Sequence, residues 1–244
     1  MIQIAADRWL GDVIKLEAFR ISGSLVPAEA QQAAQALRGI VSQPSFAYAR
    51  VSSRDVTTAQ GLEAQGFRLV DTNVTLEMDA SQLMAAASVS ARLARPADAQ
   101  AVEQIARFSF EVSRFHLDPL LPPGLANEIK AQWAANFFRG QRGDFMVVAE
   151  AQGQVAGFLQ LLTAPESVLV IDLVAVARQF RGQGLGAAMI RYAARNCGAP
   201  ARVRVGTQIA NVESLSLYQR LGFRITAAAY VFHLHGRVAA GGLR

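Results

Sequence analysis

The sequence predicts a mixed α/β protein, and two observations carry that prediction. An apolar, strand-like run at 168–176 leads into a segment with three glycines, Gly182, Gly184 and Gly186, and an alanine-rich helix follows over 187–195. Strand-like and helical patterns also alternate along most of the chain. The hydrophobic fraction of 52% provides ample material for a core.

The expected elements follow one another in a regular order. In the first third, helical composition at 27–41 and 55–65 alternates with strand-like segments at 46–51 and 69–78. From residue 91 the expected order is a strand at 91–95, a helix that Pro96 and Asp98 open and that reaches 108, a helix at 125–138, strands at 144–150 and 155–162 joined by a hairpin, the strand at 168–176, the glycine segment with its helix, a strand at 202–206, a helix from 211, and a strand at 223–234.

A short internal similarity indicates a repeat. The segment 62–70 is echoed by 218–226, and both contain Gly-Phe-Arg between a helical pattern and an alternating strand. We interpret this as a partial copy of the C-terminal fold that lacks a glycine segment, with chance similarity as the alternative. The expected division is an N-terminal domain at 1–85 and a second domain at 86–244, joined through the small and polar residues 80–90.

The glycine segment has the features of an anion-binding site. Glycine lets the backbone approach a ligand closely, and the N–H groups at a helix N-terminus carry partial positive charge. A Walker loop needs a lysine after its last glycine, and none lies near Gly184. A Rossmann fingerprint needs wider spacing than Gly182, Gly184 and Gly186 provide. A phosphorylated cofactor of another kind is the expected ligand, and a simple strand–helix turn is the alternative.

A second motif lies about 25 residues further along. Asn211, Ser214 and Tyr218 are spaced to share one face of a helix that Gly222 ends. Together the two segments resemble the signature of the GCN5-related N-acetyltransferases (GNAT family). The resemblance implies a mixed, mostly antiparallel central sheet with helices on both faces, an acyl-CoA-binding catalytic domain at 86–244, and a partial GNAT-like domain before it. It also implies acetyl-CoA as cosubstrate and direct transfer of acetyl to an amine.

Composition excludes several classes of protein. No apolar stretch reaches the ~18 residues of a transmembrane helix, and the N-terminus lacks a secretory pattern, so we expect no membrane association. The single cysteine, Cys197, excludes an internal disulfide, suits a reducing cytoplasm and is expected to be buried rather than nucleophilic. The net charge of +5 comes almost entirely from scattered arginines, which disfavours nucleic acid and permits polyanionic small molecules.

The whole chain resembles the dTDP-fucosamine acetyltransferase family, whose members acetylate the 4-amino group of dTDP-4-amino-4,6-dideoxygalactose during surface-polysaccharide synthesis. The resemblance rests on the segments 62–70, 113–115, 132–133 and 205–208. It implies an amino sugar nucleotide as the acceptor. A different acceptor, such as another small amine or a protein N-terminus, and a non-catalytic acyl-CoA sensor are the alternatives. A homodimer also stays open.

The GNAT resemblance implies roles for individual residues. The amides around the glycines would hold the pyrophosphate, and the end of the strand 168–176 would pair with the pantetheine arm, with an N–H near Val174 facing the thioester oxygen. Tyr218 is expected to protonate the leaving thiolate, with an aromatic that fills the core as the alternative. The expected cofactor contacts are Leu173, Val174, Val176, Arg181, Gly182, Gln183, Gly184, Leu185, Gly186, Asn211 and Ser214.

The sequence defines the general base and the acceptor contacts less closely than it defines the cofactor contacts. Asp172 is the first candidate base, acting through water, and an acid that only faces solvent is an equal alternative. Glu111 and Glu77 are further candidates that the sequence does not rank. The expected acceptor contacts lie on a loop and are Arg114, His116 and Asp118, with a solvated loop as the alternative. No metal site is expected, because His233 and His235 alternate on a strand without a third ligand.

Overall fold

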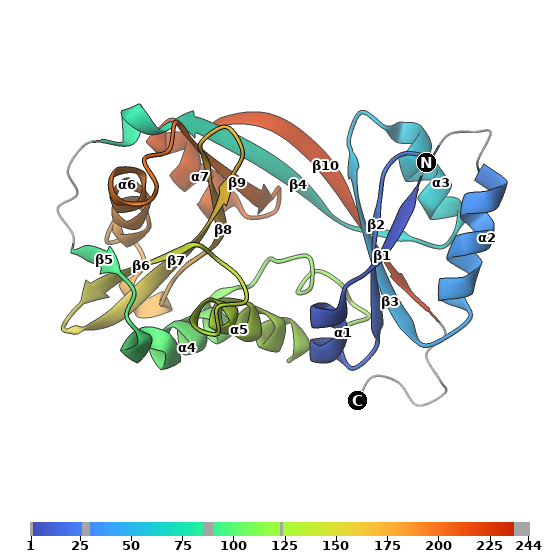
Figure 1. Cartoon of the computed structure of the whole chain (residues 1–244), viewed down its shortest axis with the longest axis horizontal. Helices are drawn as coiled ribbons and strands as arrows, with labels where there is room; N and C mark the ends of the chain where they lie inside the picture. Colours follow the sequence, from blue (N-terminus) through green and yellow to red (C-terminus); the bar gives the residue numbers. More distant parts are fainter. Residues whose placement is uncertain (1, 26–29, 85–89, 123, 237–244) are drawn as a thin grey trace.

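A computed structural model describes residues 2–25, 30–84, 90–122 and 124–236 of the chain. Its strands form one ten-stranded sheet in the order β1-β2-β3-β10-β4-β9-β8-β7-β6-β5. Neighbouring strands are antiparallel except for the pairs β2–β3 and β8–β9. The expected mixed, mostly antiparallel sheet with helices on both faces is therefore confirmed (Figure 1).

The elements agree closely with the predicted ones from residue 30 onward. The strands are β1 (Gln3–Ala6), β2 (Glu17–Ser22), β3 (Ser45–Ser52), β4 (Arg68–Asp79), β5 (Ala91–Leu93), β6 (Phe145–Ala151), β7 (Gln154–Ala164), β8 (Val168–Val176), β9 (Arg202–Gln208) and β10 (Arg224–His235). The α-helices are α1 (Arg8–Ile14), α2 (Ala30–Val41), α3 (Val56–Ala64), α4 (Ala99–Ser109), α5 (Leu125–Phe138), α6 (Leu185–Asn196) and α7 (Val212–Leu221). Short 3₁₀ turns are η2 (Ala80–Leu83), η3 (Pro96–Asp98) and η4 (Arg178–Phe180).

The differences from prediction lie near the N-terminus. Strand β1, helix α1 and strand β2 were not expected, because β1 is exposed along its whole length and α1 has only seven residues. The predicted helix at 27–41 begins at Ala30 in the structure, and residues 27–29 lie outside the described part. The expected linker at 80–90 begins with η2, and residues 85–89 are also outside the described part.

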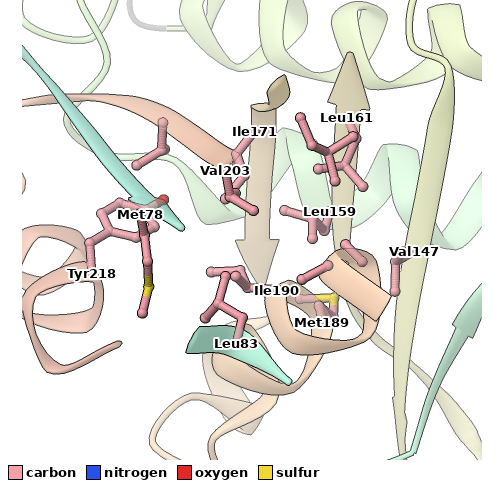
Figure 2. Close-up of a cluster of buried hydrophobic side chains, with 14 of the residues drawn as sticks. Met78, Leu83, Val147, Leu159, Leu161, Ile171, Met189, Ile190, Val203 and Tyr218 are labelled. Atoms are coloured by element: carbon pink, nitrogen blue, oxygen red, sulfur yellow. The ribbon is translucent and has the colours of Figure 1, made fainter. Parts of the chain in front are cut away.

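The C-terminal half has a helix layer on each side of its sheet. Helices α4 and α5 pack on one face, where Val102, Ile105 and Ala134 meet Phe158 of β7. Helix α6 packs on the other face, and Figure 2 shows its Met189 and Ile190 in the same buried cluster as residues of β6 and β7. Burial of these apolar faces supplies the main stabilisation of this half.

The N-terminal half is also covered on both faces. Leu37 of α2 and Leu62 of α3 lie in one buried cluster with residues of β3 and with Phe232 of β10. On the opposite face, α1 and α5 share a cluster with Phe46 of β3, in which Leu10 and Ile129 are fully buried. Because α5 belongs to the C-terminal half and α1 to the N-terminal half, this cluster joins the two.

The two halves exchange a strand. Each contains a strand–helix–strand unit, β3-α3-β4 in the first and β9-α7-β10 in the second. Strand β10 lies between β3 and β4, and strand β4 lies between β9 and β10 (Figure 1). Gly66 and Gly222 follow the two helices with φ of +90° and +98°, and the phenylalanine after each is buried. The repeated Gly-Phe-Arg segments thus occupy equivalent places, whereas a domain boundary at 85/86 stays a prediction.

The described residues contain no helix that combines the length and the apolar character needed to cross a membrane.

Candidate active site

Strands β8 and β9 separate beyond Ile171, and a cavity lies where they diverge. They pair in parallel only from Val168 opposite Arg202 to Ile171 opposite Val205. Beyond this point β8 continues along β7, and β9 continues along β4. Their facing edges are no longer paired with each other, so their N–H and C=O groups can bind an extended ligand.

A β-bulge marks the place where the strands diverge. Gln160 of β7 pairs with Leu173, and Leu161 pairs with Ile171, so Asp172 is the extra residue in β8. A bulge bends its strand and increases the local twist. This bend accounts for the separation of β8 from β9 beside the cavity.

The glycine segment continues from β8 into α6 and leaves N–H groups without partners in the helix. Gly182 and Gly184 both have φ of +78°, and an added Cβ at either would meet no atom within 4 Å. They are therefore required for the left-handed backbone rather than for space. Helix α6 has no side-chain N-cap, and the N–H of Ala188 bonds the carbonyl of Gly184. The earlier N–H groups of this turn have no intrahelical acceptor and form a place for an anion.

The side chain of Arg181 fastens this segment to α4. Its guanidinium donates to the carbonyls of Val176 and Ser109, at 3.3 and 2.8 Å, and lies 3.8 Å from the carboxylate of Glu111. The expected contact of Arg181 with pyrophosphate would therefore be made by its backbone.

The cavity has a volume of about 680 Å³ and is lined by both halves of the chain. From the C-terminal half come the diverging strands, Arg181 and the start of α7. From the N-terminal half come Tyr48 and Arg50 of β3 and Asp71 and Asn73 of β4. The volume is within the range of small-molecule sites.

Helix α7 and its N-cap place three of the expected residues at this cavity, namely Asn211, Ser214 and Tyr218. Asn211 is its N-cap, where Oδ1 accepts a hydrogen bond of 3.2 Å from the N–H of Ser214. Tyr218 is 2% exposed, packs beside Phe223 and lines the cavity. Figure 2 shows it in the buried cluster with Met78. Burial raises the pKa of the Tyr218 phenol above its ordinary value of 10. Among the described residues its hydroxyl has no hydrogen-bond partner, so it is a neutral phenol with a proton to donate.

Asp172 is held by four hydrogen bonds. Arg142 donates two, at 2.7 Å from Nε and 2.6 Å from Nη2. The indole of Trp133 donates at 2.8 Å, and the amide of Gln160 at 3.1 Å. These donors occupy both oxygens of the carboxylate. A base role for Asp172 stays a prediction that this geometry disfavours.

The three expected acceptor contacts lie in different surroundings. Arg114 lines the cavity, with its guanidinium carbon 3.9 Å from the ring centre of Tyr48 and 4.3 Å from that of Phe115. His116 is hydrogen-bonded to Ser113 at 2.6 Å, and also to Asn127, and it does not line the cavity. Asp118 is buried away from the cavity. The structure thus brings only Arg114 of these three to the site.

Asp118 binds both histidines of β10. Its Oδ2 lies 2.7 Å from Nδ1 of His233 and 2.8 Å from Nε2 of His235. Burial lowers the pKa of His233 to about 4, so at pH 7 its neutral ring donates to Asp118. Burial acts to raise the pKa of Asp118, but the two histidines and the N–H of Leu120 hold it below its usual range.

The same three residues also form a cluster that could hold a metal ion. Their ligand atoms lie within 4.8 Å of one another, so the expectation that His233 and His235 have no third ligand nearby is wrong. Asp118 lies 115 positions before His233, too far along the chain for spacing to reveal it. Each of the three atoms already takes part in a hydrogen bond, which satisfies the buried polar groups. The absence of a metal stays a prediction.

Lys130 adds a buried cation to the cavity wall. It is 9% exposed, and its Nζ lies 4.8 Å from the ring centre of Phe110 and 5.0 Å from that of Trp133. Burial, together with the charges of Arg114 and Arg142, lowers the pKa of this amine to about 8. Within the described part of the chain, no salt bridge joins Lys130 or Arg114 to a carboxylate. The cavity therefore has cations that are free to bind an anion.

Of the two other candidate bases, only Glu111 lines the cavity, and its side chain is 67% exposed. Glu77 pairs with Arg202 and Arg204 and does not line it.

Four residues that line the cavity were not expected at the site: Tyr48, Arg50, Asp71 and Lys130. They lie outside any motif, and the one signal for Asp71 is an acidic residue within a strand pattern, which is unusual at a buried position.

Comparison with known proteins decides the family. A family model described as "Acetyltransferase (GNAT) family" matches residues 100–223, which is half of the chain. The chain belongs to the GNAT family. Members of this family use acetyl-CoA as a cosubstrate. The matched range contains the glycine segment and α7.

Similar proteins include one curated relative and many solved structures. The chain is 33% identical over 141 residues to the spore coat polysaccharide biosynthesis protein SpsD of Bacillus subtilis (strain 168), covering 57% of this chain and 48% of SpsD. The chain thus spans about half the length of SpsD. A GCN5-related N-acetyltransferase from Kribbella flavida matches with a TM-score of 0.62 at 17% identity, covering 91% of this chain and 82% of that one. A tandem GNAT protein from the clavulanic acid biosynthesis pathway matches with a TM-score of 0.59 at 17% identity, covering 91% and 76%.

Proposed function

We propose that this chain is an acetyl-CoA-dependent N-acetyltransferase that acetylates the amine of a sugar nucleotide resembling dTDP-4-amino-4,6-dideoxygalactose. The observation that carries the proposal is the divergence of β8 and β9 beside the glycine segment, with Tyr218 facing the same cavity. The unpaired strand edges suit an amide-containing arm, and the N-terminus of α6 suits a pyrophosphate.

Acetyl-CoA would lie along the cavity and extend from it onto the glycine segment that follows Arg181. The backbone from Arg181 to Gly186 would hold the pyrophosphate, and β8 from Leu173 to Val176 would bind the pantetheine amides. Asn211 and Ser214 stand at the start of α7 beside the cavity, where the side-chain amide of Asn211 can donate to the arm while its oxygen caps the helix. An N–H near Val174 would bind the thioester oxygen as negative charge develops there.

Tyr218 supplies the proton for the leaving group. When the neutral amine attacks the thioester carbon, the C–N bond forms and the C–S bond breaks with its electron pair on sulfur. The phenol of Tyr218 then protonates that thiolate. Its buried position keeps it neutral until that step, because burial disfavours the phenolate.

The charges of the cavity support an anionic acceptor. Arg114 and Lys130 line it without a carboxylate partner in the described chain, and they lie beside Tyr48 and Trp133, whose rings can stack on a sugar or a base. Cations of this kind bind phosphate oxygens. The similarity to SpsD, which is described as a spore coat polysaccharide biosynthesis protein, favours the same class of acceptor.

The experiment is an acetylation assay with purified chain, acetyl-CoA and dTDP-4-amino-4,6-dideoxygalactose, followed by thiol release and product mass. We expect turnover, with a KM for the sugar nucleotide about tenfold higher in Lys130→Met, since a charge-assisted phosphate contact is lost. The same amino sugar without its nucleotide should be insensitive to this substitution. Lys15→Met, at the only other lysine and on the surface, is the matched control.

Two results would reject the proposal. Faster turnover of an uncharged amine or a protein N-terminus would indicate a different acceptor. Binding of acetyl-CoA without turnover of any primary amine would indicate an acyl-CoA sensor.

A further inference from the structure

Asp71 lies on the cavity wall that the N-terminal half provides. In the sheet, Arg50 of β3 is opposite Val231 of β10, and Val231 is opposite Asp71 of β4. Residues directly opposite one another point to the same face of a sheet. All three line the cavity. Strand β9 pairs directly with β4 and borders the gap in which we expect the thioester, so Asp71 faces the same space as the reacting groups.

This carboxylate is buried and poorly satisfied. Asp71 is 6% exposed, and neither oxygen accepts a hydrogen bond of ordinary geometry from the described residues. The Thr72 amide and the Gln208 side chain are the nearby polar groups that act on it. Arg50, the cation on the same cross-strand line as Asp71, makes its hydrogen bonds elsewhere. It donates to Asn73 at 2.5 Å and to Thr75 at 3.0 Å. An unpaired buried carboxylate is costly to retain. A ligand that donates hydrogen bonds would satisfy it.

The other carboxylates of the cavity differ from Asp71. Asp172 accepts four hydrogen bonds, and Glu111 is largely exposed beside Arg181. Of the carboxylates that line the cavity within the described chain, Asp71 alone combines burial with free oxygens.

The surroundings of Asp71 give it basic character. Burial raises its pKa to about 6, against the opposing effects of the Thr72 amide, Gln208, Arg50 and Arg114. The groups that face it from the neighbouring elements are Arg50 on β3, Val231 on β10, Gln208 on β9 and Arg114 on the loop. At pH 7 it is therefore mostly ionised, yet it holds a proton more readily than an ordinary aspartate.

We propose that Asp71 binds the ammonium group of the acceptor and removes its proton before attack. The inference rests on the proposed function. One N–H proton passes to an oxygen of Asp71, which leaves a neutral amine. The amine's lone pair attacks the thioester carbon, and the thiolate leaves and takes the proton of Tyr218. After attack, the acylated nitrogen still carries two protons. It loses one of them to the Tyr218 phenolate, which leaves the neutral amide, and Asp71 releases its own proton to water. The products are the amide, free thiol and one proton.

The acid and the base then come from different halves of the chain. Tyr218 belongs to α7 of the C-terminal half, and Asp71 belongs to β4 of the N-terminal half. The strand exchange holds them at one cavity, because β4 lies between β9 and β10.

The test compares Asp71→Asn and Asp71→Glu with the wild type from pH 5.5 to 9. The assay uses dTDP-4-amino-4,6-dideoxygalactose, or whichever primary amine the wild type acetylates if that sugar is not turned over. We expect Asp71→Asn to lower kcat/KM about 100-fold at pH 7 and to remove the limb of the pH profile near 6. Asp71→Glu should recover part of the rate, and the Kd of acetyl-CoA should change less than about twofold in both variants. Asp79→Asn, on an exposed residue of the same strand, is the matched control.

The outcomes separate this proposal from the proposed function. If Asp71→Asn keeps the wild-type rate within threefold and keeps the pH profile, Asp71 is not the base, although the acetyltransferase activity stands. If the sugar nucleotide fails but another amine is acetylated with the expected dependence on Asp71, the acceptor is wrong and the base is right. A wild type that acetylates no primary amine overturns both. Binding of dTDP-6-deoxygalactose, which has a hydroxyl in place of the amine, should not weaken in Asp71→Asn, and a loss there would indicate a structural role.

Discussion

Arg142 binds Asp172 with two nearly parallel hydrogen bonds of 2.7 and 2.6 Å, at the bulge where β8 turns away from β9. This pair, with Trp133 and Gln160, fixes the shape of the strand that would hold the thioester. Bidentate pairing of this kind is geometrically specific. The relationship suggests that Asp172 positions the strand rather than transferring protons.

Asp172→Asn should therefore lower activity without changing its pH dependence. The amide of asparagine places N–H donors against those of Arg142, which costs about 1–3 kcal/mol for the buried groups left unpaired. We expect kcat to fall about tenfold and the pH–rate profile to keep its shape. A lost limb near pH 6 in this variant would instead identify Asp172 as the base.

Tyr218→Phe should remove the acid while keeping the ring in the core. We expect kcat to fall about 10²- to 10³-fold, with the KM of acetyl-CoA within about twofold of the wild type. Thermal unfolding should be unchanged or slightly higher, because the hydroxyl has no partner to lose among the described residues. Tyr192→Phe, at a tyrosine packed against the same core, is the control. Full activity of Tyr218→Phe would show that another group protonates the thiolate.

Gly184→Ala should weaken acetyl-CoA binding about tenfold. Alanine in the left-handed region costs about 1–2 kcal/mol, and the strain displaces the N–H groups that face the pyrophosphate. Gly140→Ala is a matched control, since Gly140 has φ of +68° and equally open surroundings but lies after α5. Both variants should lose similar stability, and calorimetric titration should show weaker binding only for Gly184→Ala. An equal loss of acetyl-CoA affinity in the two variants would contradict a pyrophosphate site at the glycine segment.

Asp71→Asn should stabilise the protein at high pH. The pKa of Asp71 is raised to about 6 in the folded chain, so the folded state favours the protonated form. The wild type therefore loses stability as pH rises from about 4 to 6, by on the order of 2–3 kcal/mol. Asparagine does not ionise, so its variant should melt higher than the wild type at pH 8 and equally at pH 4. If the wild type and Asp71→Asn have identical melting curves at both pH values, ionisation of Asp71 does not destabilise the fold.

Asp118→Asn should destabilise the fold by about 2–4 kcal/mol, because one histidine then loses its acceptor in a buried site. The pKa values of Asp118 and His233 are both lowered in the folded state, so the stability from this cluster is lost as pH falls. For His233 the loss runs from about 6.5 down to about 4. Thermal unfolding from pH 4 to 8 would measure both effects, and a variant as stable as the wild type at pH 7 would contradict them.

The residues that the sequence assigned to the cofactor lie in local motifs, whereas those that line the rest of the cavity come from distant parts of the chain. The glycine segment and α7 are local motifs, in which backbone conformation and helix spacing follow from neighbouring residues. Arg50, Asp71 and Lys130 meet at the cavity only through sheet register and helix packing, which local patterns do not encode. His116 and Asp118 were expected to contact the acceptor because they are polar loop residues, and the structure surrounds them with other polar groups instead.

The elements of the fold were likewise predicted where a local pattern defines them and missed where it does not. Strands from β3 onward alternate clearly enough to be located within one or two residues. Strand β1 and helix α1 are too short or too exposed to show a period. The strand exchange was not foreseen, although the repeated Gly-Phe-Arg segments indicated two related units. Strand order depends on pairing between segments more than 100 residues apart.

The exchange also determines when the protein can become active during synthesis. Strand β10 is the last described element, and its paired residues in β4 and β3 precede it by between 147 (Arg224 and Glu77) and 189 positions (His235 and Phe46). Such distant pairing is slow to form, and it leaves earlier strand edges exposed while the chain waits. Until β10 is in place, Val231 cannot connect Arg50 to Asp71, and the N-terminal wall of the cavity is incomplete. A nascent chain could fold its C-terminal helices and strands β5 to β9 first, but the wall formed by Arg50, Val231 and Asp71 would be complete only once β10 has paired.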